Sequence, residues 1–379
     1  MSRALTIASP HARGAPVAPA RGIWLVGPSY DLSFIILSAA LAALPHLAHS
    51  WSRSTVFVDL AVTMLIGGPH LFATYTMTVM EPDFRARYPR YAMGALVLPI
   101  IIVTLAITNL TLLVTVFFFW ASVHVIHQAA FVADAYRFKD PRGWSWTSRV
   151  IDYGLLFTSM YPIATSKLMQ GAFRTGGRTL LFPEALRLPV LPPLVWAAFL
   201  SFLVAFLVKT GWEIGHGRFH GPKTLHMAVA TALFALTPTL SNLDVAFEGL
   251  NVWHSFQYLA VVLYLNRVRE QRGLIGSRLV RTVSRRGPRL YALCLGFTLG
   301  AGALFFVVLA TVVKLGAFSR GAPMNNFLLG PIYSEQHYFA FYSVILSFLL
   351  IHYYFDHFLF LHADAKITPT FEPLTAEAA

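Results

Sequence analysis

The sequence has a single cysteine, Cys294, and few charged residues, which make up only 12% of its 379 positions. One cysteine excludes an internal disulfide framework and a cysteine-rich metal site such as an iron–sulfur cluster. Soluble domains contain roughly 25% charged residues, whereas hydrophobic residues here reach 56%. This composition is typical of a membrane protein rather than a soluble one.

The few charges that remain are mostly basic, with a formal net charge of +12. A basic excess can indicate nucleic-acid binding, but these Lys and Arg residues lie between apolar runs. If the amino terminus is cytoplasmic, most of the 29 fall on the cytoplasmic side, which is the positive-inside pattern. We therefore predict no nucleic-acid partner. We expect a multi-pass protein of the cell's inner (cytoplasmic) membrane, with both termini cytoplasmic.

Crossing the hydrocarbon core takes about 20 mostly apolar residues in a helix. The sequence predicts an all-α transmembrane bundle of about ten spans, at roughly 30–49, 55–80, 91–108, 110–136, 149–168, 190–211, 224–240, 242–266, 290–317 and 337–362. The breaks near Asn109 and Ser241 are so short that we expect helical hairpins there. Residues 23–364 would form this domain, between a disordered cytoplasmic tail at 1–22 and a second cytoplasmic tail at 365–379.

Four of the 14 histidines lie near the middle of separate predicted spans: His70, His124, His254 and His352. Each is about 12 to 16 residues from the outer end of its helix, and at 1.5 Å per residue this is a spread of only about 6 Å in depth. Ionisable groups inside a span are costly and usually functional. One such histidine can simply be a polar clamp between helices, but four at one depth predict a shared metal site.

Further residues extend the predicted site. His127 shares a helix face with His124, and the sequence leaves open which of the two binds the metal. Imidazole suits iron, copper and zinc, and the second nitrogen of each ligating ring needs a hydrogen-bond partner. The candidates for orienting the ligands are Gln128, Asn251 and Gln257; those for moving protons or positioning an intermediate are Asp356, Glu248 and Tyr75 or Tyr258. Asp356 is alternatively a metal ligand itself. His220 and His226, in or beside a cytoplasmic loop, are expected to be solvated.

These residues predict a membrane-embedded, non-haem metal-dependent oxidoreductase, either an oxygenase or a desaturase. Iron is the first choice of metal; copper, zinc and haem b are the alternatives. The expected partners are a lipid or isoprenoid substrate from the bilayer, dioxygen and an electron-donor protein. Two other functions stay open: a haem b electron-transfer protein, and a proton or metal-ion transporter.

Three short strings carry a family resemblance: Pro69–His70, the His-x-x-Gln of 254–257 and the His-Tyr-Tyr-x-Asp of 352–356. They resemble motifs of His-rich bacterial polytopic membrane proteins of uncharacterised function. Single histidines on separate spans, together with one closely spaced pair, resemble the Brp/Blh family of membrane β-carotene dioxygenases. This resemblance implies one iron ion, held at His70, His124 or His127, His254 and His352. The membrane fatty-acid desaturase and hydroxylase superfamily fits less well, because the sequence has no adjacent histidine pair.

Overall fold

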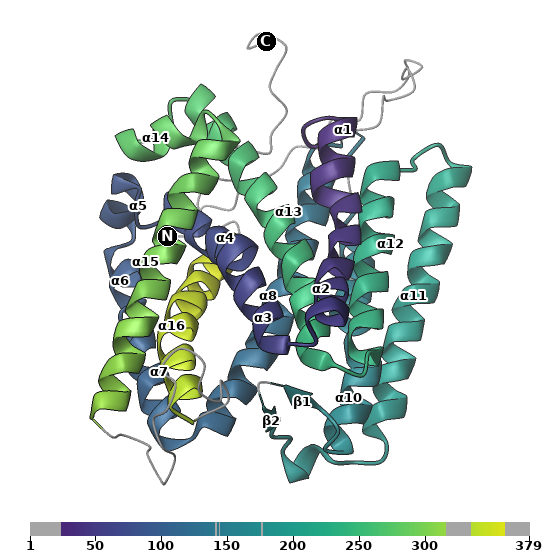
Figure 1. The fold of residues 1–379 in the computed structure, drawn as a ribbon. Helices are drawn as coiled ribbons and strands as arrows, with labels where there is room; N and C mark the ends of the chain where they lie inside the picture. Colours follow the sequence, from purple (N-terminus) through teal and green to yellow (C-terminus); the bar gives the residue numbers. More distant parts are fainter. Residues whose placement is uncertain (1–23, 141, 144, 176, 316–334, 361–379) are drawn as a thin grey trace, which may run out of the picture.

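The computed structural model describes residues 24–315 and 335–360, apart from residues 141, 144 and 176. This part of the chain is a bundle of helices with one small antiparallel hairpin at one end (Figure 1). The predicted all-α class is therefore confirmed. The predicted tails, 1–22 and 365–379, lie outside the described residues.

The elements, in chain order, have the following bounds. The first half contains α1 (Pro28–Tyr30), η1 (Asp31–Ile36), η2 (Leu37–Ala43), α2 (Leu44–Ser52), α3 (Thr55–Val62), η3 (Thr63–Gly67), α4 (Gly68–Ala73), η4 (Thr74–Thr76), α5 (Pro82–Arg87), α6 (Pro89–Gly94), α7 (Val97–Thr108), α8 (Leu110–Phe138), α9 (Trp146–Ser159) and α10 (Tyr161–Met169). The second half contains β1 (Arg174–Thr175), β2 (Arg178–Thr179), η5 (Glu184–Leu186), α11 (Leu191–Gly215), α12 (Gly221–Leu236), η6 (Thr237–Thr239), α13 (Leu243–Gln271), α14 (Arg278–Ser284), α15 (Gly287–Lys314) and α16 (Glu335–Phe360).

Seven helical stretches within the described residues are long and apolar enough to cross a membrane: Pro28–Ser52, Thr55–Thr76, Pro89–Thr108, Leu110–Phe138, Leu191–Gly215, Gly287–Val312 and Phe339–His357. They indicate a multi-pass membrane protein. The other three predicted spans correspond to α9 with α10, α12 with η6, and α13. The chain between α9 and α10 is interrupted just before Pro162, α12 is short, and α13 carries many polar residues.

Two tight turns bring neighbouring helices together as the sequence predicts. Asn109 separates α7 from α8, and its side chain accepts a hydrogen bond from the Leu112 amide at 3.0 Å. Asn242 caps α13 in the same way, accepting from the Val245 amide at 3.2 Å. Asparagine is a favoured residue at this position because its side chain satisfies an amide that the helix leaves free. Both hairpins direct the long helices α8 and α13 into the bundle.

The stretch from α3 to η4 is irregular around Pro69, where the sequence predicts a kink. A wide helical turn, η3, precedes α4, and a tight one, η4, follows it. Proline has no amide hydrogen to donate to the carbonyl one turn earlier. That carbonyl, on Leu65, accepts instead from the Tyr291 hydroxyl of α15 at 2.7 Å. A side chain at Gly68 would collide with Thr298, so glycine permits the close packing of α4 against α15.

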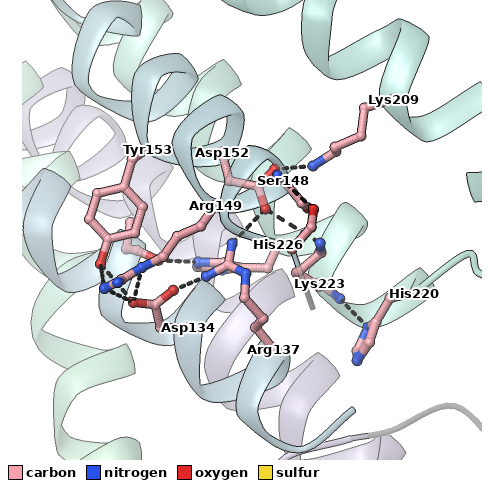
Figure 2. A network of polar contacts seen from close by, with 12 residues as sticks. Asp134, Arg137, Ser148, Arg149, Asp152, Tyr153, Lys209, His220, Lys223 and His226 are labelled. Atoms are coloured by element: carbon pink, nitrogen blue, oxygen red, sulfur yellow. Dashed lines mark hydrogen bonds and ion pairs between the residues drawn. The ribbon is translucent and has the colours of Figure 1, made fainter. Parts of the chain in front are cut away.

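A buried network of charges joins α8, α9, α11 and α12 (Figure 2). Arg137 of α8 bridges two carboxylates, with Nη2 2.7 Å from Asp152 Oδ2 and Nη1 paired with Asp134. Lys209 and Lys223 also contact Asp152. Buried charges are stable only when they are paired and hydrogen-bonded. The network thus ties these four helices together and fixes α8, which carries one of the predicted ligands.

Candidate metal centre

Four histidines from separate helices meet inside the bundle: His70 of α4, His124 of α8, His254 of α13 and His352 of α16. Each is at most 4% exposed. Each offers one ring nitrogen, and these four atoms lie within 4.8 Å of one another. The ring centroids of His70 and His124 are each 4.7–5.0 Å from those of His254 and His352. The predicted meeting of the four mid-span histidines is confirmed.

The backbone orients the His70 ring. Its Nδ1 lies 2.5 Å from the carbonyl oxygen of Gly67. A carbonyl only accepts hydrogen bonds, so Nδ1 carries the hydrogen. Ser255 Oγ lies 2.8 Å from the same nitrogen and donates its own hydrogen to Asn251 Oδ1 at 3.0 Å. It follows that the lone pair of neutral His70 is on Nε2, which faces the other histidines.

His352 is oriented by hydroxyl groups and a carboxylate. Thr74 Oγ1 donates to Asp356 Oδ1 at 2.8 Å, and the Tyr258 hydroxyl donates to the same oxygen at 2.5 Å. With both hydroxyl hydrogens on the carboxylate, Thr74 Oγ1 accepts from His352 Nδ1, which is 2.5 Å away. The lone pair of His352 is then also on Nε2.

The two nitrogens that carry these lone pairs, His70 Nε2 and His352 Nε2, are only 3.1 Å apart. Two lone pairs that face each other repel unless a cation lies between them. Three further buried atoms around this point have no hydrogen-bond partner: His124 Nε2, His254 Nδ1 and Asp356 Oδ2. Asp356 Oδ2 is 3.5 Å from His352 Nε2 and 3.8 Å from His124 Nε2. Buried polar atoms are rarely left unpaired, and a metal ion bound at this point could pair with all three.

The closest pair of ring nitrogens has the spacing of two neighbouring ligands on one metal ion. Imidazole nitrogens bound to a common ion at about 2.0–2.1 Å lie about 2.9–3.4 Å apart at neighbouring positions of a square or tetrahedral site. The 3.1 Å between His70 Nε2 and His352 Nε2 is within that range. Metal-bound histidines typically donate their second N–H to a carbonyl or another acceptor, as His70 and His352 do here. The four buried histidines could therefore bind a metal ion.

The three amide side chains predicted to orient the ligands lie near the cluster, but none of their hydrogen bonds goes to a histidine ring. Gln128 Nε2 donates to the backbone carbonyl of His254 and to Gln257 Oε1, both at 3.0 Å. Gln257 in turn donates to the Ile35 carbonyl at 2.7 Å. These two residues hold α8, α13 and η1 together. Asn251 acts through Ser255, as described above, and through Glu248, to whose Oε2 it donates at 3.1 Å.

His127 and Tyr75 lie outside the four-histidine group. The His127 ring packs against those of His357 and Phe360, with centroids 5.5 and 5.4 Å apart. Of the two residues between which the sequence leaves the choice open, His124 is the one that the structure brings into the four-histidine group. The Tyr75 hydroxyl donates to the Phe348 backbone carbonyl at 3.2 Å rather than to one of the histidines.

A cavity of about 180 Å³ adjoins the cluster, with His70 and His254 in its wall. Most of its lining is apolar and aromatic, including Phe117 and Phe118, and Glu248 lines it as well. Ligand sites are typically apolar clefts with a few well-placed polar groups. The cavity therefore provides space for an apolar molecule beside the histidines.

Sequence reasoning missed two hydroxyl residues and misjudged two histidines. Thr74 is one helical turn after His70, and Ser255 directly follows His254. The sequence signal that could have identified Thr74 and Ser255 is their position close to a candidate ligand. His220 and His226, expected to be solvated, are 4% and 0% exposed. That expectation is wrong because they pack against α8, where His226 Nε2 donates to the Ala129 carbonyl at 2.9 Å and the Tyr136 ring contacts His220 edge-on and His226 at a tilt.

The fold and the cluster together define a class: a helical, multi-pass membrane protein with a buried four-histidine site that could bind a metal ion. No protein-family model, curated protein or solved structure matches the chain.

Proposed function

We propose that the protein is a membrane-embedded, non-haem iron-dependent oxidoreductase that uses dioxygen to oxidise a lipid or isoprenoid. The observation that carries this proposal is the set of four buried imidazoles, two of which, His70 and His254, line an apolar cavity. A metal site serving only stability would not need a cavity beside it. Substrate would enter from the bilayer, and an electron-donor protein would supply any reducing equivalents.

Iron is favoured by the donor set. Imidazole nitrogens suit iron, copper and zinc, whereas a carboxylate beside histidines is typical of non-haem iron oxygenases. Asp356 supplies that carboxylate, with Oδ2 near His124 and His352. Bound iron would supply the binding and activation of dioxygen. His70, His124, His254 and His352 would hold the ion, while Thr74 and Tyr258 fix the carboxylate through its other oxygen.

The spacing disfavours the haem alternative. Axial histidines of a haem lie on opposite faces of a wide macrocycle. Here four ring nitrogens lie within 4.8 Å of one another, and the third and fourth rings occupy the space that a macrocycle would need. A transporter would need a polar path across the bundle, whereas the cavity beside the cluster is largely apolar.

The proposal includes ten spans, with both termini cytoplasmic, in the inner membrane. Its support is the distribution of Lys and Arg between the apolar runs. With this orientation the hairpin β1–β2 faces outward (Figure 1), and the carboxyl end of α8, which carries Asp134 and Arg137 of the charge network, lies toward the cytoplasm. The four histidines would then lie near the middle of the bilayer.

Metal analysis of the purified, iron-reconstituted protein tests the proposal. We expect about one iron per chain, no haem absorption band, and loss of iron in His254→Ala and His352→Ala. His216→Ala is the matched control, because this exposed histidine only contacts Trp212 on its own helix. Iron retained in full by both cluster variants would overturn the proposal, as would a wild-type protein that binds no metal.

A further inference from the structure

One tyrosine contacts the candidate metal centre and also lines the cavity beside it. Tyr353 directly follows His352 on α16, and its ring stacks on that of His124, with centroids 4.0 Å apart and an interplanar angle of 23°. The residue is 6% exposed and is part of the cavity wall. The stacking fixes the position of the ring, and the hydroxyl is the only polar atom of this side chain.

The Tyr353 hydroxyl forms no hydrogen bond with any residue that the structure describes. Buried tyrosine hydroxyls usually have a partner, as those of Tyr75, Tyr136 and Tyr258 do. Three other buried hydroxyl groups of the cavity wall also have protein partners within hydrogen-bond distance, namely those of Ser122, Thr175 and Thr298. The hydroxyl of Tyr353 is therefore free to bind a molecule that enters the cavity.

The cavity wall on the same two helices is otherwise largely apolar. Phe117 and Ala121 of α8 line the cavity, as do Leu346 and Leu349 of α16. A lipid chain would pack against these side chains, but a pure hydrocarbon would leave the Tyr353 hydroxyl without a partner. A carbonyl, ether or alcohol oxygen in the chain would accept its hydrogen. A carboxylate would need more than one such donor in an apolar space.

We propose that the substrate carries a neutral oxygen atom, as a ketone, ether or alcohol, and that the Tyr353 hydroxyl donates a hydrogen bond to it. This inference rests on the proposed function and names the class of its substrate, which is an oxygen-bearing lipid or isoprenoid instead of a hydrocarbon. Because Tyr353 stacks on His124, the bound oxygen holds a nearby carbon of the chain beside the histidines. Tyr353 is thus a substrate-binding residue that selects the position to be oxidised.

Infrared spectroscopy of a bound ketone tests this inference. The full-length protein is placed in nanodiscs of a diether phosphatidylcholine, which has no ester carbonyl, and a long-chain dialkyl ketone is added. A hydrogen bond lowers the stretching frequency of the ketone carbonyl, so we expect a second band in the wild-type protein, below that of the ketone in empty nanodiscs. An alkane and an ether of the same length then compete for the site. The alkane should compete about two- to tenfold more weakly, because it accepts no hydrogen bond.

Two variants complete the design. Tyr353→Phe keeps the ring and its stacking on His124, so it should retain iron but lose the shifted band. The matched control Tyr30→Phe should keep the band, because the hydroxyl that it removes donates to the Ala260 carbonyl at 2.9 Å.

The inference is overturned if the wild type shows no shifted band, if the band persists in Tyr353→Phe or is lost equally in Tyr30→Phe, or if the alkane competes as well as the ether. The comparison of ether and alkane uses only the wild type, so it does not depend on the folding of a variant. Iron analysis of the same samples separates the two proposals. A wild type with the shifted band but no iron overturns only the iron proposal, and one with iron but no shifted band overturns only this inference.

Discussion

Thr74→Val removes one oxygen atom and keeps the shape of the side chain. Thr74 Oγ1 contacts three partners: His352 Nδ1 at 2.5 Å, Tyr258 OH at 2.6 Å and Asp356 Oδ1 at 2.8 Å. The substitution leaves the His352 N–H without an acceptor, while Tyr258 still holds Asp356. Losing such an orienting partner typically weakens metal binding 10- to 100-fold, which is about 1.4–2.7 kcal/mol.

Competition with a chromophoric chelator, using ferrous iron and zinc in turn, measures this effect. The matched control is Thr78→Val, because Thr78 is equally buried but its hydroxyl donates only to the backbone carbonyl of Thr74, at 3.0 Å. Both variants should lose some stability, which thermal unfolding of the metal-free proteins would record. Only Thr74→Val should lose metal affinity. If its affinity stays within twofold of wild type, or if Thr78→Val weakens binding equally, the orienting role of Thr74 is refuted.

Two further predictions concern the end of the bundle that carries the charge network of Figure 2. Asp152→Asn should lower the free energy of unfolding by about 3–5 kcal/mol, because it leaves Arg137, Lys209 and Lys223 buried near one another without their shared carboxylate. Denaturant unfolding in detergent measures this free energy. In the control variant Glu184→Gln, at an exposed ion pair, the free energy of unfolding should change by at most about 1 kcal/mol. His220 lies in the turn before α12, and burial lowers its pKa from 6.5 to about 4, although Asp140 opposes the shift. Its neutral ring accepts the Lys223 amide hydrogen at 3.2 Å. The stabilisation of the folded state by neutral His220 is therefore complete above pH 6.5 and is lost as the pH falls toward 4, to a limit of about 3 kcal/mol. His220→Asn keeps a capping acceptor that does not titrate, so unfolding curves at pH 7 and pH 4.5 should differ less in this variant than in wild type; an equal difference would contradict the assignment.

The depth of the histidines could be predicted because a helix rises by a fixed amount per residue. Offsets along four distant segments therefore convert directly into positions along the bundle axis. The rotation of each helix about its own axis, which decides the side chains that face the cluster, is set by packing against neighbouring helices. Residue spacing along the sequence does not give this rotation. His124 and His127 illustrate this: both are at suitable depth, but α8 turns His124 toward His254 and His352, and His127 toward His357.

The hydroxyl residues were harder to foresee for another reason. Threonine and serine in helices commonly bond back to their own backbone, as Thr115 and Ser122 of α8 do. Thr74 differs because it begins the tight turn η4, where it reaches Tyr258, His352 and Asp356 across two helix interfaces. The same irregular stretch, with its wide turn η3, places the Gly67 carbonyl within reach of the His70 ring. Ideal helix geometry predicts neither contact.

A single shared proton cannot pair with all the histidine and carboxylate atoms of the cluster that have no hydrogen-bond partner. A proton shared between His70 Nε2 and His352 Nε2 would relieve the repulsion of their lone pairs across 3.1 Å. It would still leave His124 Nε2, His254 Nδ1 and Asp356 Oδ2 without partners. The two hydroxyl donors near Asp356 both serve Oδ1, so its second oxygen is a buried anionic site of its own. One divalent metal ion, with several coordination positions, could satisfy the facing imidazoles and this carboxylate oxygen together.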